Sequence, residues 1–181
     1  MDWILGVDPG LKGAVVLLYK GNPFYSIELS KAFNAKEGAA KAPSFLDPMK
    51  LAPLLRMMSQ SPETILPEAI AIELPLCLPG LANRAIATAH TNWGILFATL
   101  KMTYPMAEVV LIQPRDWVST IHSRFCQDPH NITIGVKTKT KECFKRVWPN
   151  TNIHSTEGSR DAALIGFYHL WKNNALPTTC R

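Results

Sequence analysis

The chain has 181 residues, of which 47% are hydrophobic and 18% charged, and it carries a formal net charge of +5. This length predicts one globular domain over residues 1–181, and no apolar stretch approaches the ~20 residues that a membrane helix needs. The excess of basic residues suits a phosphate-rich partner, although many ordinary proteins share it.

Two features bear on the compartment in which the protein works. The apolar N-terminal segment is interrupted by Asp2 and Asp8 and has no basic region before it, so it does not resemble a secretory leader. The four cysteines are far apart and form no C-x-x-C pair, which argues against a zinc ribbon and for reduced thiols. We therefore expect a cytoplasmic protein, encoded by a bacterium or phage or working in an organelle, with no membrane partner.

The first part of the chain is rich in predicted strands. Residues 3–8 and 13–19 are strand-like, and a turn signal at 20–23 separates them from a third, alternating run at 24–29. These three runs predict an antiparallel meander. Residues from about 31 to 45 are small and charged without a clear period, so we expect a mobile loop there.

The rest of the chain alternates between helices and strands. Asp47 and Pro48 form an N-cap and first-turn signature, and apolar residues at helical spacing follow as far as Met58. Short apolar runs predict strands at 69–73 and 108–112, and helices are predicted at 82–102, 114–121, 138–148 with Thr138 as the cap, and 159–171. This order implies an α/β fold with a mixed five-stranded sheet flanked by helices on both faces.

The long predicted helix has an apolar stripe with two interpretations. The stripe consists of Ile86, Ala89, Trp93, Leu96, Phe97 and Leu100. It packs either against the core of its own domain or against a second copy of the chain. The small residues Ala85, Ala89 and Gly94 would permit the close helix approach that a dimer needs.

Two acidic residues end apolar strands. Asp8 closes ILGVD and Glu73 closes AIAIE, positions where an ionised side chain is costly unless it is paired or bound to a metal. Parallel neighbouring strands would place both at one edge of the sheet, where function gathers in such folds. Alternatively, Asp8 belongs to a turn or to the D-x-G motif of actin-like ATPases, and Glu73 is a paired structural acid.

The last predicted helix supplies two more acids. Glu157 and Asp161 are four residues apart, so they project from the same side of the helix start, above buried apolar residues. Glu157 alone would also favour a helix N-terminus through the macrodipole. Because Mg²⁺ prefers a few converging oxygen ligands, acids from three separate parts of the chain predict a magnesium site.

These segments resemble a known family. ILGVDPGLKGAVVL, AIAIELP and EGSRDAALIGFYHL are similar, in that order, to the motifs of RuvC-type Holliday junction resolvases. The order of the remaining segments resembles the monokaryotic chloroplast branch and its bacterial and phage relatives. The resemblance spans nearly the whole chain and implies an RNase H-like fold, a homodimer, and metal-dependent paired nicking of four-way DNA junctions.

The resemblance also implies roles for individual residues. It implies that Asp8, Glu73, Glu157 and Asp161 bind two Mg²⁺ ions, for which Mn²⁺ can substitute. Asp8 is our candidate for the ligand that bridges the two ions. In such sites the ions lie roughly 3.5 to 4 Å apart. The best-known bacterial members space their last two ligands three residues apart, whereas the chloroplast-like branch uses four, as this chain does.

Basic residues and one leucine are the candidates for DNA binding. The candidates are Lys137, Lys139, Lys141, Lys145, Arg146 and Arg84, together with Leu76, which occupies the position of the family's apolar wedge. Lysines in this segment would contact phosphates and make binding salt-dependent, or they form an ordinary solvated helix face. Leu76 is alternatively a core residue.

Three other functions are also compatible with these sequence features. One is a different RNase H-like nuclease acting on flaps, branched DNA or RNA–DNA hybrids, for which the same acids would serve. Another is an actin-like ATPase, although no second phosphate loop is present and 181 residues are few for its two lobes. The third is a non-catalytic junction-binding protein.

Overall fold

The structure is a computed structural model that describes residues 1–33, 44–60, 65–75, 82–125, 135–151, 153 and 156–176. Its strands are β1 (Trp3–Asp8), β2 (Ala14–Tyr19), β3 (Asn22–Glu28), β4 (Ala69–Glu73) and β5 (Glu108–Ile112). Its helices are the 3₁₀ turn η1 (Leu29–Ala32) and α1 (Pro48–Met58), α2 (Asn83–Thr103), α3 (Pro114–Phe125), α4 (Val136–Val147) and α5 (Glu157–Lys172).

The five strands form one mixed sheet in the order β3-β2-β1-β4-β5. β1, β2 and β3 are antiparallel neighbours, whereas β4 and β5 run parallel to β1. This confirms the predicted mixed five-stranded sheet. The turn between β2 and β3 is shorter than predicted, because Lys20 and Gly21 have positive φ angles of 48° and 82° and β3 already begins at Asn22.

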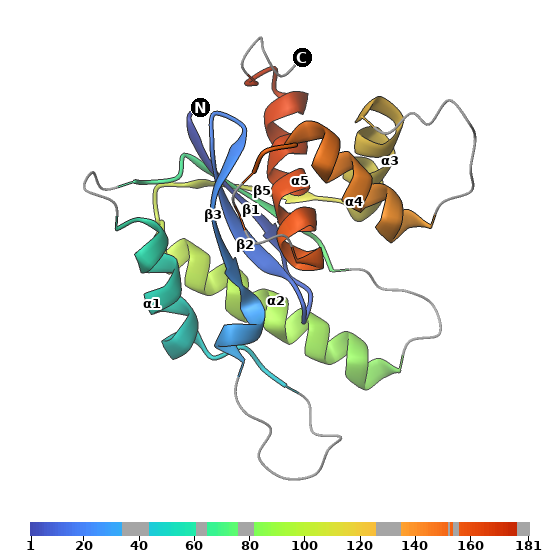
Figure 1. The fold of residues 1–181 in the computed structure, drawn as a ribbon. Helices are drawn as coiled ribbons and strands as arrows, with labels where there is room; N and C mark the ends of the chain where they lie inside the picture. Colours follow the sequence, from blue (N-terminus) through green and yellow to red (C-terminus); the bar gives the residue numbers. More distant parts are fainter. Residues whose placement is uncertain are drawn as a thin grey trace.

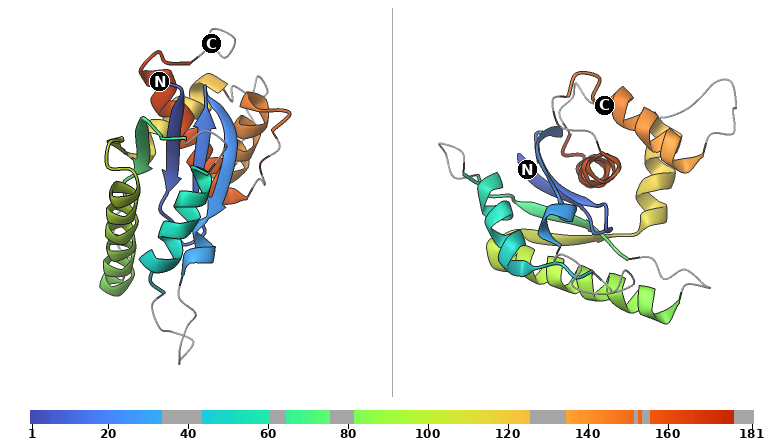
Figure 2. Two further views of the ribbon diagram at one scale, coloured as in Figure 1. Left: turned by 90° about the vertical axis from the view of Figure 1, so that its left-hand side faces the viewer. Right: turned by 60° about the horizontal axis from the view of Figure 1, so that its bottom comes forward.

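Helices cover both faces of the sheet (Figure 1). In the right-hand view of Figure 2, α5 lies on one face, with α3 and α4 beside it, and α1 and α2 lie on the other. Alternate strand residues enter two separate cores: Ile4 packs in the core with Phe167 of α5, whereas Leu5 packs in the core with Leu51 and Leu96. Each core fixes its helices against the sheet by burying apolar area.

The helix boundaries differ from the predictions where the caps were misjudged. α5 begins two residues early because the Thr156 hydroxyl accepts a 3.2 Å hydrogen bond from the Ser159 amide. α4 also begins two residues early, with Gly135 as its N-cap, so the predicted Thr138 cap is wrong. α1 has the predicted cap, since the Asp47 carboxylate accepts from the Met49 amide at 2.9 Å.

The residues of the apolar stripe of α2 differ in how deeply they are buried. Leu96 and Leu100 are buried in the core, whereas Ile86, Trp93 and Phe97 are half-buried and Ala89 is exposed. The core interpretation therefore holds for Leu96 and Leu100, and Trp93 packs against the same core.

Three further expectations concern the predicted mobile loop, the state of the cysteines and membrane-spanning helices. Most of the predicted mobile loop at 31–45 lies outside the described residues, and Leu29–Ala32 forms η1. Cys143 is disulfide-bonded, which contradicts the expectation of reduced thiols. None of the described helices has the length and apolar character needed to cross a membrane.

Glycines let α5 lie directly on β1. A Cβ atom on Gly6 would overlap the carbonyl oxygen of Ala162, and one on Gly166 would lie 3.2 Å from the Gly6 Cα. At the other end of the contact, Gly13 and Gly158 form an isolated parallel bridge. The backbones of β1, the turn after it and α5 are therefore in direct contact at two levels.

This contact predicts the effect of one added methyl group. Gly6→Ala should lower the free energy of unfolding by about 3 kcal/mol or more, because the Cβ meets backbone that cannot move aside without separating α5 from the sheet. Urea denaturation measures the loss. Gly135→Ala is the matched control, since a Cβ there meets nothing within 4 Å, and it should cost below about 1 kcal/mol. Equal losses in the two variants would contradict this account of the contact.

Candidate active site

Asp8 and Glu73 lie at the same end of two adjacent parallel strands. Val7 of β1 pairs with Ile72 of β4, so the next residue on each strand is one of the two acids. Both side chains are half-buried. Asp8 accepts a 2.9 Å hydrogen bond from the Gly10 amide, which holds its carboxylate at the start of the following turn. The two strand-end acids are thus at one edge of the sheet, as the sequence predicts.

The start of α5 adds Glu157 and Asp161 to this edge. The Gly13–Gly158 bridge joins the turn after Asp8 to the first turn of α5, and a Cβ on Gly158 would overlap the Lys12 carbonyl oxygen. The first turn of the helix therefore lies against the loop that follows the first acid. The four acids come from β1, β4 and α5, which are far apart in the sequence.

Burial and the proximity of the acids to one another shift their pKa values. Burial raises the pKa of Asp161 to about 7, with the negative charges of Asp8, Glu73 and Glu157 adding to the effect. Burial likewise raises the pKa of Glu73 to about 7, against the hydrogen bond from Trp117, and the charge of Asp8 raises it further. Burial also raises the pKa of Asp8, while the Gly10 amide opposes the shift. The site therefore holds negative charge at a cost that a cation would offset.

Glu73 is held by two tryptophans. The indole N–H of Trp117, from α3, donates a 2.7 Å hydrogen bond to Glu73 Oε1. The indole N–H of Trp93, from α2, donates a 2.9 Å bond to the Glu73 carbonyl oxygen. The side chain and the main chain of this acid are thus fixed from helices on opposite faces of the sheet.

A lysine approaches the acids from α4. Lys137 Nζ lies 2.6 Å from Glu157 Oε1, and this ion pair lowers the pKa of Glu157. The Lys137 side chain is 81% exposed, so it remains accessible to a ligand. Lys137, Glu157 and Asp161 share a cleft of about 200 Å³ whose other lining residues are Trp117, Val118, Val136, Thr140 and Arg160.

The donor set fits a hard divalent cation in its chemistry. All four acids offer oxygen ligands, and two of them bind protons unusually tightly because the site is buried and, to a smaller extent, because like charges crowd it. Within the described residues, no three His, Cys, Asp or Glu side chains are grouped closely enough to hold a metal ion. Binding would therefore require the carboxylates to draw closer around the cation.

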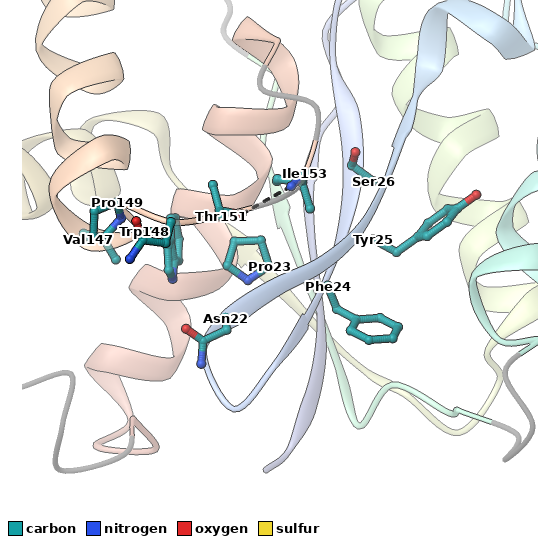
Figure 3. A pocket seen from close by; sticks show the side chains of 11 residues that line it. Asn22, Pro23, Phe24, Tyr25, Ser26, Val147, Trp148, Pro149, Thr151 and Ile153 are labelled. Carbon is teal, nitrogen blue, oxygen red and sulfur yellow. Dashed lines mark hydrogen bonds between the residues drawn. The ribbon is translucent and has the colours of Figure 1, made fainter.

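A larger cavity lies away from the acids. It has a volume of about 700 Å³ and is lined by Asn22–Ser26 of β3 and by Val147–Thr151 and Ile153 (Figure 3). Asn22 pairs with Tyr19, which pairs with Trp3, so this cavity is at the opposite end of the sheet from Asp8. Its lining carries no charged side chain, unlike the edge of the sheet that holds the acids.

Comparison with known proteins identifies the fold. No protein-family model and no curated protein sequence matches the chain. A solved structure described as "T. thermophilus RuvC in complex with Holliday junction substrate" is similar with a TM-score of 0.57 and 12% identity, covering 96% of this chain and 97% of that one. A second, "Thermus thermophilus RuvC structure", has a TM-score of 0.52 and 12% identity, with 95% of each chain covered.

The chain has a RuvC/RNase H-like fold. The sequence predicts the mixed five-stranded sheet with helices on both faces, and the structure adds the strand order 3-2-1-4-5. At 12% identity the similarity establishes the fold, and the roles of individual residues depend on the geometry of this site.

The predicted DNA-binding residues occupy different places on this RuvC-like fold. Lys137, Lys141, Lys145 and Arg146 of α4 are exposed, whereas Lys139 is half-buried. Because α4 begins at Val136, Lys137, Lys141 and Lys145 share one face of the helix. Arg84 is exposed in the first turn of α2, and Leu76 lies outside the described residues.

Sequence reasoning missed Trp117 and Trp93 at the site. Trp117 lies in the helix predicted at 114–121, and Trp93 lies in the apolar stripe of the long helix. The available signal was that a buried indole N–H needs an acceptor. That signal does not say which acceptor, and here it is a residue 44 positions away for Trp117 and 20 for Trp93.

The raised pKa values predict how stability depends on pH. The Asp161 carboxyl ionises near 3.8 when unfolded but keeps its proton up to about 7 when folded. Between these values the unfolded state releases the proton first, so its contribution to stability is present below about pH 4 and lost as pH rises towards 7. The Tm of wild type should therefore fall relative to that of Asp161→Asn as the pH rises from 5 to 7.5.

Thermal unfolding followed by circular dichroism measures this difference. Magnesium at pH 7.5 should raise the Tm of wild type more than that of Asp161→Asn, because only the wild type has this negative charge to neutralise. Parallel pH curves for the two proteins would show that Asp161 ionises normally and would contradict the raised pKa that burial and neighbouring charges give it.

Proposed function

We propose that this protein is a magnesium-dependent, structure-specific endodeoxyribonuclease that resolves four-way DNA junctions by paired nicking. The observation that carries the proposal is the gathering of Asp8, Glu73, Glu157 and Asp161 at one sheet edge of a RuvC-like fold. A similar structure, of T. thermophilus RuvC, is described as a complex with a Holliday junction substrate.

The four acids would hold the divalent cation. Asp8 lies between Glu73 on the neighbouring strand and the start of α5, so it is the candidate for a ligand shared by two ions. A bound Mg²⁺ or Mn²⁺ supplies charge neutralisation at the phosphate and a water nucleophile at neutral pH. The protein's own contribution is to hold the carboxylates at a half-buried edge, where they bind a cation more strongly than in open solvent.

The exposed face of α4 would bind the DNA backbone. Lys137 lies at the acids, and Lys141 and Lys145 continue along the same face away from them. A row of ammonium groups that starts at the catalytic edge would place a phosphate next to the cation site. Affinity should then weaken as salt rises, since each phosphate contact releases counterions.

The first half of α2 would form a homodimer interface. On the helix, Ala85 and Ala89 lie on the same side as the buried Asn92 and Leu96, yet both alanines are exposed. In Figure 1 this end of α2 extends beyond the sheet. A two-fold pairing of such faces would place two active sites on one symmetric junction.

A charge on this face should separate the dimer. Wild type should elute with a mass of twice the 20.1 kDa of one chain, and Ala89→Glu should weaken association by about 100-fold or more, because an unpaired carboxylate would be buried. Light scattering after size exclusion measures the mass. Ala87→Glu is the matched control, since Ala87 is exposed on the opposite side of the helix. A wild-type monomer at all concentrations would contradict this interface.

Cleavage of a labelled synthetic four-way junction tests the function itself. With Mg²⁺ the wild type should make paired symmetric nicks, and Asp8→Asn should reduce the rate by about a thousandfold or more, since bound metal supplies several kcal/mol of transition-state stabilisation. Asp47→Asn controls for the substitution, because asparagine also caps a helix and the Asp47 carboxylate already accepts from the Met49 amide.

The same assay distinguishes the alternatives. Matched duplex, flap and RNA–DNA hybrid substrates accompany the junction, with EDTA as the metal-free control. Preference for the flap or the hybrid would retain the acids and overturn the substrate. Junction binding without metal-dependent cutting would identify a structural DNA-binding protein and would contradict the proposed catalysis.

A further inference from the structure

The hydrogen bond between Trp117 and Glu73 differs from the contacts of the other acids. Lys137 is a cation that pairs with Glu157 from an exposed position, so it competes with any metal for that carboxylate. Trp117 is neutral, only 4% exposed, and packed in the core beside Ile112 and Ile121. A neutral donor fixed by packing orients a carboxylate without repelling a cation.

The contact leaves half of the carboxylate available. Trp117 occupies Oε1 of Glu73, and Oε2 accepts no hydrogen bond from the described residues. The main chain beside it is also fixed, because the Leu74 amide donates to the Ile112 carbonyl oxygen at 2.9 Å and Trp93 donates to the Glu73 carbonyl. The direction of the free oxygen is thus set by the position of α3.

We propose that Trp117 is a positioning residue that aims the Glu73 carboxylate at the divalent cation before the cation binds. The inference rests on the proposed function, since it requires a cation at these acids. It adds that α3, which contributes no ligand of its own, controls cation affinity through one indole N–H. Preorganisation of this kind lowers the ordering cost of binding.

Calorimetric titration of the full chain with Mn²⁺ tests the proposal without DNA. Trp117→Phe removes the indole N–H and keeps an aromatic ring, and it should weaken Mn²⁺ binding by roughly 10- to 100-fold, the effect typical of such second-layer changes. Trp148→Phe is the matched control. Trp148 is 5% exposed, donates a 2.9 Å hydrogen bond to the Gly21 carbonyl, and is remote from the acids, so its loss should change affinity by less than about twofold.

A double-mutant cycle separates positioning from general loss of structure. In a Glu73→Ala background, Trp117→Phe should cause no further loss of Mn²⁺ affinity, because the carboxylate that it orients is gone. An equal loss in both backgrounds, or a loss no greater than that of Trp148→Phe, would overturn the proposal.

A measurement on the wild type covers the case in which Trp117→Phe does not fold. In ¹H–¹⁵N spectra the indole N–H signal of Trp117 should shift on addition of Mg²⁺, while that of Trp148 should not. An unmoved Trp117 signal in the presence of bound Mg²⁺ would overturn the positioning role alone. If the wild type binds no divalent cation, or if Asp8→Asn does not weaken that binding, the proposed function fails, and this inference fails with it.

Discussion

The direct contact between α5 and β1 is the constraint on which the acidic site depends. Gly6 faces Ala162 and Gly166, and Gly13 faces Gly158, at separations that leave no space for a Cβ atom. A helix packed on ordinary side chains would lie farther from the sheet and would hold Glu157 and Asp161 away from Asp8. The glycines provide no side-chain packing at these positions. They allow β1 and α5, which are far apart in the sequence, to hold their carboxylates in one cluster.

The charge of this cluster follows from its packing. Asp161 and Glu73 each bind a proton up to about pH 7, because burial removes water from them and neighbouring carboxylates repel their charge. Lys137 offsets part of that charge at Glu157, from a side chain that remains exposed. The folded protein therefore maintains an unfavourable charge distribution that a divalent cation would relieve. Groups of buried titratable side chains with strongly shifted pKa values are candidates for a functional site.

The sequence predicted the strands and the placement of the acids well, for physical reasons that act locally. The apolar runs ending at Asp8 and Glu73 are buried strands, and their parallel pairing puts both ends at one edge. Prediction failed where the outcome depended on a choice between neighbouring residues of similar chemistry. Thr138 was assigned as a cap, yet the helix begins before it, after Gly135. The turn signal at 20–23 contained the correct turn, but it did not show that Asn22 and Pro23 already belong to β3.

The roles of Trp117 and Trp93 required the fold itself. Each forms a hydrogen bond to Glu73 from a different helix, and local sequence patterns do not show such distant contacts. The disulfide at Cys143 also required the fold, since the spacing of the cysteines alone did not predict it.

Locating a bound cation directly is the measurement that best tests the central claim. Crystals of the full chain soaked in Mn²⁺ should show an anomalous scattering peak among the oxygens of Asp8, Glu73 and Asp161, with the carboxylates drawn closer than in the metal-free protein. A peak elsewhere, or none at this edge at saturating Mn²⁺ and neutral pH, would contradict the assignment of these acids as the metal site.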